Sequence, residues 1–101
     1  MIRAAKIDNN HKEIVNKLRQ FPGISVISVA QLKNFCDICV GFKGKNYLYE
    51  IKCNKKKKLT QGELHFQFIW RGHIKTITSA EEILEEIEYF PKIKSYPFYD
   101  I

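Results

Sequence analysis

The chain has 101 residues with 17 Lys and Arg against 11 Asp and Glu, so its formal net charge is +6. A chain of this length favours one domain, residues 1–101, with one modest hydrophobic core. It has no apolar run long enough to span a membrane and no apolar segment of a secretion signal near its start. We therefore expect a cytoplasmic protein with no membrane partner.

The first predicted elements are a helix over residues 8–20 and a strand over Ile24–Ala30. Asp8 or Asn9 can cap the helix, and the strand is predicted because its segment is β-branched and apolar. Glu13 borders the apolar stripe of the helix. Its ordinary role would be an exposed pair with the lysine four residues on. The buried stripe is Ile14, Val15 and Leu18.

Two apolar runs, Cys36–Phe42 and Tyr47–Cys53, flank a short polar link and predict a β-hairpin. A two-residue loop would place Asp37 opposite Glu50, and a four-residue loop would place Asp37 opposite Lys52. Because side chains alternate along a strand, both registers put these three charges on one face. Two carboxylates beside an ammonium predict a site for a hard divalent cation, with a lysine that handles a proton or faces a phosphate.

The three cysteines, Cys36, Cys39 and Cys53, are an odd number on predicted strands, which is not a disulfide framework. The C-x-x-C spacing also occurs in zinc sites. On a strand, however, residues three apart point to opposite faces, and no second Cys or His pair lies nearby. We expect small, buried, apolar side chains instead.

Residues 54–58 read Asn-Lys-Lys-Lys-Lys and follow the charged strand directly. Such a run is usually a solvated loop, but at this place it can contact the phosphates that flank a scissile bond. Thr60 then begins a helix to about Trp70. Glu63 completes a T-x-x-E capping box, and its alternative role is a group of the metal shell or one that orients water.

The second predicted helix carries apolar side chains that we expect in the core. Trp70 at its end is also expected there, with stacking on a base as the alternative. A strand over Ile74–Thr78 follows, and a capping box at Ser79 opens a last helix to about Tyr89. The expected core residues of the second helix are Leu64, Phe68 and Ile69.

The predicted order is therefore α-β-β-β-α-β-α, an α/β fold with a mixed four-stranded sheet flanked by helices. Charge is uneven along it. Residues 1–78 hold fifteen Lys or Arg and only five acids, whereas residues 80–90 hold five Glu. Carboxylates kept within a basic surface indicate metal ligands near a polyanion, and the last helix is the side away from it.

Asp37, Glu50 and Lys52 form the pattern Asp-x(12)-Glu-x-Lys, which is similar to the core of the PD-(D/E)XK nucleases. More narrowly, the chain resembles the small stand-alone VRR-NUC nucleases of phages and bacteria. The resemblance runs almost end to end, and its blocks occur in the family's order. These blocks are Arg3-Ala4-Ala5-Lys6-Ile7-Asp8, Glu13-Ile14-Val15, Asp37–Phe42, Asn46–Lys52, Leu59-Thr60, Trp70-Arg71-Gly72 and Ser79–Leu84.

Three departures from that family pattern stand out. Cys36 occupies the place of the usual proline, the loop after Lys52 is short and contains only lysines after its asparagine, and Glu63 stands where glutamine is typical. The first two leave the pattern intact. The third changes a motif side chain, so the role of Glu63 is open between cap and catalysis.

The resemblance implies a restriction-endonuclease-like fold and metal-dependent hydrolysis of DNA phosphodiester bonds. It implies Mg²⁺, with Mn²⁺ as a substitute, held by Asp37, Glu50, the Ile51 carbonyl and Glu13. Lys52 would orient or deprotonate the attacking water. The expected catalytic residues are Asp37, Glu50, Lys52, Glu13 and Glu63, and the expected DNA-contacting residues are Arg3, Lys6, Lys33, Lys55, Lys56, Lys57 and Lys58.

The resemblance further implies a homodimer that acts on branched DNA, in the manner of a Holliday-junction resolvase. A chain this small has little room for base readout, which favours recognition of shape. Two alternatives stay open. One is a less selective phage nuclease acting on flaps, nicks or duplex DNA, and the other is a non-catalytic basic DNA-binding module.

Overall fold

The computed structural model describes residues 9–91, and within them the chain forms three helices and four strands in the predicted order. Arg3 and Lys6 lie outside the described residues. None of these helices is long and apolar enough to cross a membrane. The helices are α1 (His11–Leu18), α2 (Gln61–Ile69) and α3 (Ala80–Glu86), and the strands are β1 (Ser25–Ser28), β2 (Ile38–Phe42), β3 (Lys45–Ile51) and β4 (Lys75–Ile77).

The four strands form one mixed sheet in the order β1-β2-β3-β4. β1, β2 and β3 pair antiparallel, and β4 joins β3 in parallel after a crossover through α2. Phe42 pairs with Lys45, so the hairpin turns through Lys43 and Gly44. Both turn residues have positive φ, 50° and 78°, as a type I′ turn requires. The two-residue loop is thus confirmed, and the four-residue loop is wrong.

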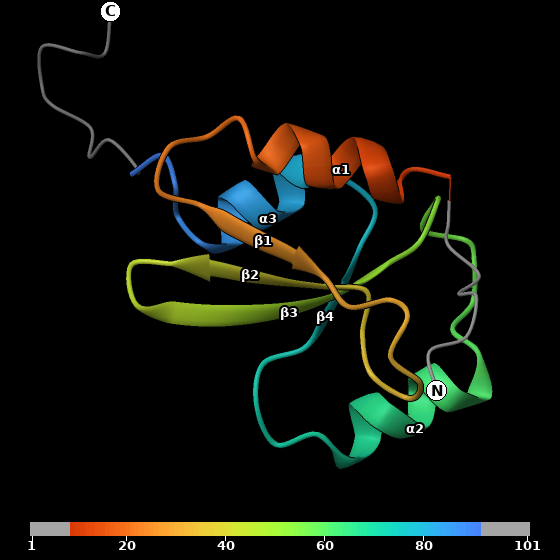
Figure 1. Cartoon of the computed structure of the whole chain (residues 1–101). Coiled ribbons are helices and arrows are strands. Elements are labelled where there is room, and N and C mark those ends of the chain that lie inside the picture. The colour runs from red at the N-terminus through yellow and green to blue at the C-terminus, as the bar shows by residue number, and fades with distance from the viewer. Residues whose placement is uncertain (1–8, 92–101) are drawn as a thin grey trace, which may run out of the picture.

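The sheet separates two helical layers (Figure 1). α1 and α3 lie on one of its faces, and α2 lies on the other. Alternation along β3 sends Tyr49 and Ile51 toward α1 and α3, and Leu48 toward α2. Glu50 and Lys52 share the face of Leu48, so both charges of the Glu-x-Lys motif lie on the α2 side.

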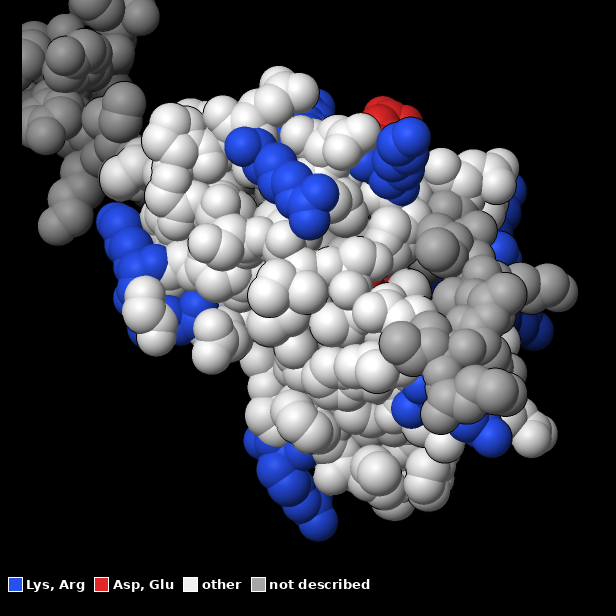
Figure 2. All heavy atoms as spheres, viewed as in Figure 1, with Lys and Arg blue, Asp and Glu red and all other residues white. Residues whose placement is uncertain are grey.

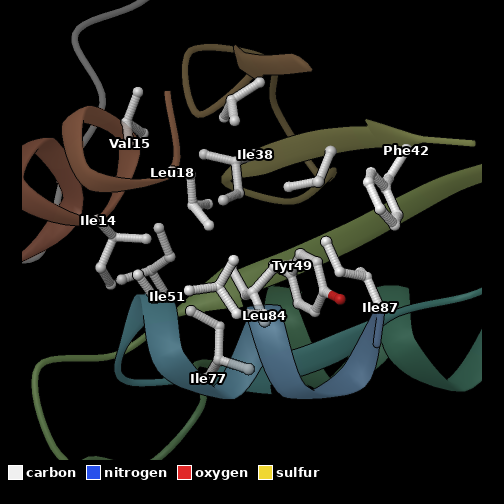
Figure 3. Packing of buried hydrophobic residues seen from close by; sticks show 14 residues of the cluster. Ile14, Val15, Leu18, Ile38, Phe42, Tyr49, Ile51, Ile77, Leu84 and Ile87 are labelled. Atoms are coloured by element: carbon white, nitrogen blue, oxygen red, sulfur yellow. The ribbon is translucent and has the colours of Figure 1, made fainter. Parts of the chain in front are cut away.

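α1 and α3 close a dense apolar core over their face of the sheet, as Figure 3 shows. Leu18, Ile38 and Ile83 come from three different elements and are all fully buried. Each such side chain contributes about 1.5–3 kcal/mol by its removal from water. Tyr49 is buried here too, and its hydroxyl donates a hydrogen bond to Glu86 Oε1 at 2.5 Å. This face is therefore closed, and the Tyr49 hydroxyl within it has a hydrogen-bond partner.

The α2 face has a much smaller apolar cluster, built on Cys36, Leu48 and Phe66. Within α2 only Phe66 is buried. The expectation that the other large apolar side chains of α2 lie in the core is therefore wrong, because the helix packs on the sheet mainly through Phe66. Trp70 stacks on Phe66, with ring centroids 5.2 Å apart, but stays partly exposed. The side chains expected in the core but found exposed are Leu64, Phe68 and Ile69.

The three cysteines are free and differ in exposure. Cys36 is buried and Cys39 is half-buried, as expected for small apolar side chains on strands. Cys53 is exposed and does not lie on a strand, so the predicted strand to Cys53 is too long. The reason is that β3 ends at Ile51, and Cys53 already belongs to the loop that follows.

Candidate active site

Asp37 stands at the start of β2 and is tied to the end of β3. Ile38 pairs with Tyr49, and the ladder continues because the Asp37 N–H donates to the Tyr49 carbonyl at 3.0 Å. The Asp37 side chain takes over the next bond, since its Oδ2 accepts from the Ile51 N–H at 2.7 Å. This bond brings the Asp37 carboxylate alongside the Glu50–Ile51 segment, as the predicted two-residue loop requires.

Lys52 is held at both its backbone and its side chain. It directly follows β3, and its N–H donates to the Ile77 carbonyl of β4 at 2.9 Å. Only 4% of the residue is exposed. Its Nζ donates to Glu63 Oε1 of α2 at 2.6 Å. A lysine is rarely this buried without a carboxylate partner, and Glu63 provides that partner.

Glu63 fills the capping role that its sequence position predicted, and it also pairs with Lys52. Its Oε1 accepts from the Thr60 N–H at 2.7 Å, and its own N–H donates to Thr60 Oγ1 at 3.2 Å. The capping box is therefore confirmed. The same Oε1 accepts from Lys52, so the first turn of α2 faces the strand charges. Burial raises the pKa of Glu63, but hydrogen bonds with Glu50 and Lys52 outweigh it and leave the pKa lowered.

Among the groups of this site, Glu50 has the most strongly shifted pKa. It is 5% exposed. Burial, followed by the nearby carboxyl groups of Asp37 and Glu63, raises the pKa of Glu50 to about 10. At neutral pH the Glu50 carboxyl therefore holds a proton when no cation is present. Three carboxyl groups thus converge beside one ammonium, a local excess of acid inside a basic protein.

This donor set fits a hard divalent cation. Within residues 9–91, no three His, Cys, Asp or Glu side chains are grouped as a ready metal cage. Mg²⁺ does not need one, because it keeps several waters and binds proteins through one or two carboxylates. Asp37 and Glu50 are two such carboxylates, and they lie close to each other. A cation in place of the proton on Glu50 would leave that carboxylate charged and compensated.

Asn10 is a supporting residue that the sequence analysis did not identify. It is the N-cap residue of α1, but its side chain makes no capping bond. Its Nδ2 instead donates to the Lys52 carbonyl at 3.0 Å and to the Thr78 carbonyl at 2.8 Å. These partners lie 42 and 68 positions away, so no local pattern could reveal them. Asn10 therefore links the segments that follow β3 and β4 through the carbonyls of Lys52 and Thr78.

Glu13 is exposed on α1, one turn after Asn10. Together with Thr78 and Ser79 it lines a small cavity of about 70 Å³ between α1 and the start of α3. The neighbouring Lys17 pairs with Glu81 of α3. The structure thus puts Glu13 at the α1–α3 seam, while Asp37, Glu50, Lys52 and Glu63 meet on the α2 side.

The predicted DNA-contacting lysines of the described region are all exposed. Lys33 lies in the loop before β2, and residues 55–58 form the loop that joins Lys52 to α2. Asn54 orders this loop, because its Oδ1 accepts from the N–H groups of Lys56 and Lys57 at 2.9 and 3.0 Å. In the view of Figure 2, Lys and Arg side chains are spread over the visible face and acidic atoms show in few places.

Comparison of the chain with protein-family models, with curated proteins and with solved structures found no match.

Proposed function

We propose that this protein is a metal-dependent DNA endonuclease with a restriction-endonuclease-like fold. One observation carries the proposal: Asp37, Glu50, Lys52 and Glu63 converge on the α2 face of the sheet. Burial and the neighbouring carboxyls there raise the pKa of Glu50 to about 10. The element order and the mixed sheet also support it, since they agree with the fold that the sequence resemblance implies.

Mg²⁺, or Mn²⁺ in its place, would be held by Asp37, Glu50 and the Ile51 carbonyl. Glu13 lies at the α1–α3 seam, so we do not include it among the ligands. When bound, the cation lowers the pKa of a coordinated water and neutralises charge on the phosphate. Lys52 orients that water or donates a hydrogen bond to the oxyanion that develops on the phosphate. The bond from Glu63 keeps the Lys52 ammonium on this face. No covalent intermediate on the protein is needed.

DNA binding rests on the exposed cations around the site. The loop of residues 55–58 joins the two elements that carry Lys52 and Glu63, so phosphates that contact its lysines lie next to the carboxylates. Binding that depends on such contacts weakens steeply as salt rises. Lys33, Arg3 and Lys6 complete the proposed DNA-binding set.

We propose branched DNA, with a four-way junction as its type, as the substrate of a homodimer inside the cell. A two-fold dimer would present two sites to two strands. The described chain offers no long element for the major groove, which favours recognition by shape. A less selective nuclease acting on flaps, nicks or duplex shares the same site and differs only in substrate.

One observation favours a non-catalytic DNA-binding module as the second candidate. Lys52 already has its carboxylate partner at 2.6 Å in Glu63, and a protonated Glu50 would leave the group electrically satisfied without a metal. In that case Asp37, Glu50 and Glu63 would serve only to seat Lys52 and cap α2.

The deciding experiment is cleavage of a labelled four-way junction against a linear duplex of the same sequence, with Mg²⁺, Mn²⁺ or EDTA. We expect metal-dependent nicks, and a rate at least about 1000-fold lower for Asp37→Asn, because loss of a metal ligand removes several kcal/mol of transition-state stabilisation. The matched control is Glu85→Gln, an exposed acid on α3, which should cut normally.

Other outcomes of the cleavage experiment would support other functions. Equal cutting of junction and duplex would remove the junction preference and keep the nuclease. Tight, salt-sensitive binding without cutting under any metal condition would leave the DNA-binding module. Unchanged cutting by Asp37→Asn would refute the proposed site.

A further inference from the structure

The outer face of α2 carries exposed apolar side chains that the proposed site does not use. Phe68 is 84% exposed and Leu64 is 54% exposed. They are four residues apart, so they lie one above the other on the same side of the helix. Gln61 and His65 lie beside them and are also exposed. In Figure 1 this helix stands apart from the other two, on its own side of the sheet.

The inner side of α2 is firmly anchored, so the exposed face is presented by a fixed helix. Phe66 packs in the small cluster and stacks on Trp70 at an interplanar angle of 29°. Trp70 Nε1 donates to the His73 carbonyl at 3.1 Å. Gln67 Nε2 donates to Thr76 Oγ1 of β4 at 2.9 Å. Phe68 projects from this support and is exposed.

Cations lie at both ends of this apolar face. The lysines of residues 55–58 precede α2, and the exposed Arg71 follows it. The one acid of α2 is Glu63, and it is turned toward Lys52. A fitting partner is therefore anionic along its length and carries flat apolar groups between its charges. A nucleic-acid strand with unpaired bases has this chemistry, because each base offers an aromatic face to an exposed phenyl ring.

We propose that the outer face of α2 binds unpaired DNA bases, with Phe68 as the residue on which a base stacks. Paired bases in a duplex show only their edges, so the proposal makes this face selective for opened strands. It rests on the proposed nuclease function for its purpose: bases held on α2 would place the open part of a branched substrate next to Asp37 and Glu50.

The charges also argue against a second copy of the chain as the occupant. Two copies that met on this face about a two-fold axis would bring their lysine loops and their Arg71 side chains close together. Like charges that face each other across an interface are unfavourable, and α2 has no exposed acid to offset them. A polyanion instead gains from the same cations.

The test is equilibrium binding in EDTA, which prevents cleavage, of a fluorescent single-stranded oligonucleotide and of its duplex. We expect Phe68→Ala to bind the single strand about tenfold more weakly and the duplex within about twofold of the parent, because one stacking contact is lost. Phe68→Trp should retain single-strand binding. Ile27→Ala, which truncates a 63% exposed side chain on β1, is the matched control and should change neither.

Three outcomes would overturn the inference. They are an equal loss for both DNA forms, no loss for either, and a Phe68→Ala protein that changes only its oligomeric state in sedimentation. Circular dichroism on each variant verifies that the fold is intact. Because binding is read without metal, a Phe68 effect in a protein that never cuts DNA would retain the base-binding face and refute only the nuclease.

Discussion

The two faces of the sheet differ in the kind of side chain that they bury: one buries an apolar core, and the other buries charged groups beside a small apolar cluster. On the α1–α3 face, apolar residues from six elements close a core whose polar group, the Tyr49 hydroxyl, is paired with Glu86. On the α2 face, the apolar cluster has three buried residues with four partly buried ones packed against them, and Glu50 and Lys52 are also buried on this face. One strand, β3, supplies both sets by alternation.

This contrast shows that a single strand, β3, contributes side chains to the stabilising core on one face and to the candidate site on the other. Tyr49 and Ile51 face the core, while the residues next to each of them carry charge. Moving the register by one residue would exchange the two sets. The positive-φ turn at Lys43 and Gly44 therefore determines which face becomes the candidate site.

The largest expected difference in stability is between truncations on the two faces. Ile83→Ala removes a fully buried side chain and should lower the free energy of unfolding by about 2–5 kcal/mol. Leu64→Ala removes an exposed one and should cost no more than about 0.5 kcal/mol. Urea unfolding followed by far-UV circular dichroism measures both. A large cost for Leu64→Ala would mean that the outer face of α2 is covered in solution.

A medium effect is expected from pH on the α2 face. Burial and two neighbouring carboxyls raise the pKa of Glu50 to about 10, so the folded state binds a proton that the unfolded state has released. Stability from this group is complete below pH 4.5 and declines as pH rises toward 10.

Glu50→Gln should flatten that decline, because the amide needs no proton. Ca²⁺ or Mg²⁺ should stabilise the parent protein more at pH 8.5 than at pH 6, since metal and proton compete for one carboxylate. Chemical unfolding at both pH values, with and without metal, gives the four numbers. An equal metal effect in Glu50→Gln would show that the cation binds elsewhere.

The smallest effect is expected from Glu86 on the core face. Burial raises the pKa of Glu86, but hydrogen bonds from Tyr49 and His73 outweigh it and leave the pKa lowered. Stability from this group is present above about pH 4.5 and is lost as pH falls below that value, by less than about 1 kcal/mol because the group is partly exposed. Unfolding of Glu86→Gln between pH 3 and 6 should lack this loss, and Glu85→Gln should keep it.

The opposite shifts of Glu50 and Glu86 sharpen the comparison of the faces. Glu86 is surrounded by donors, namely the Tyr49 hydroxyl, His73 and the Lys75 ammonium at 3.6 Å. Glu50 has carboxyl neighbours instead. A carboxylate on the core face is thus stabilised by the fold, whereas the one on the α2 face requires a proton or a cation.

The sequence alone determined the element order, the hairpin and its charged face, and the capping box at Thr60. These features depend on residues within a few positions of one another. Alternation puts Glu50 and Lys52 together whatever surrounds them, and a T-x-x-E segment forms its two bonds within one turn. They were predictable because their physics is local.

Only the tertiary structure decided what those charges meet. The Glu63 bond to Lys52, the Asn10 bridge to the Lys52 and Thr78 carbonyls and the exposure of Phe68 depend on how α1 and α2 sit on the sheet. So does the raised pKa of Glu50, because burial and neighbouring charge are sums over elements far apart in the chain. Residue type and spacing determine the local structure and the possible chemistry of a side chain, and tertiary packing determines its burial and its partners.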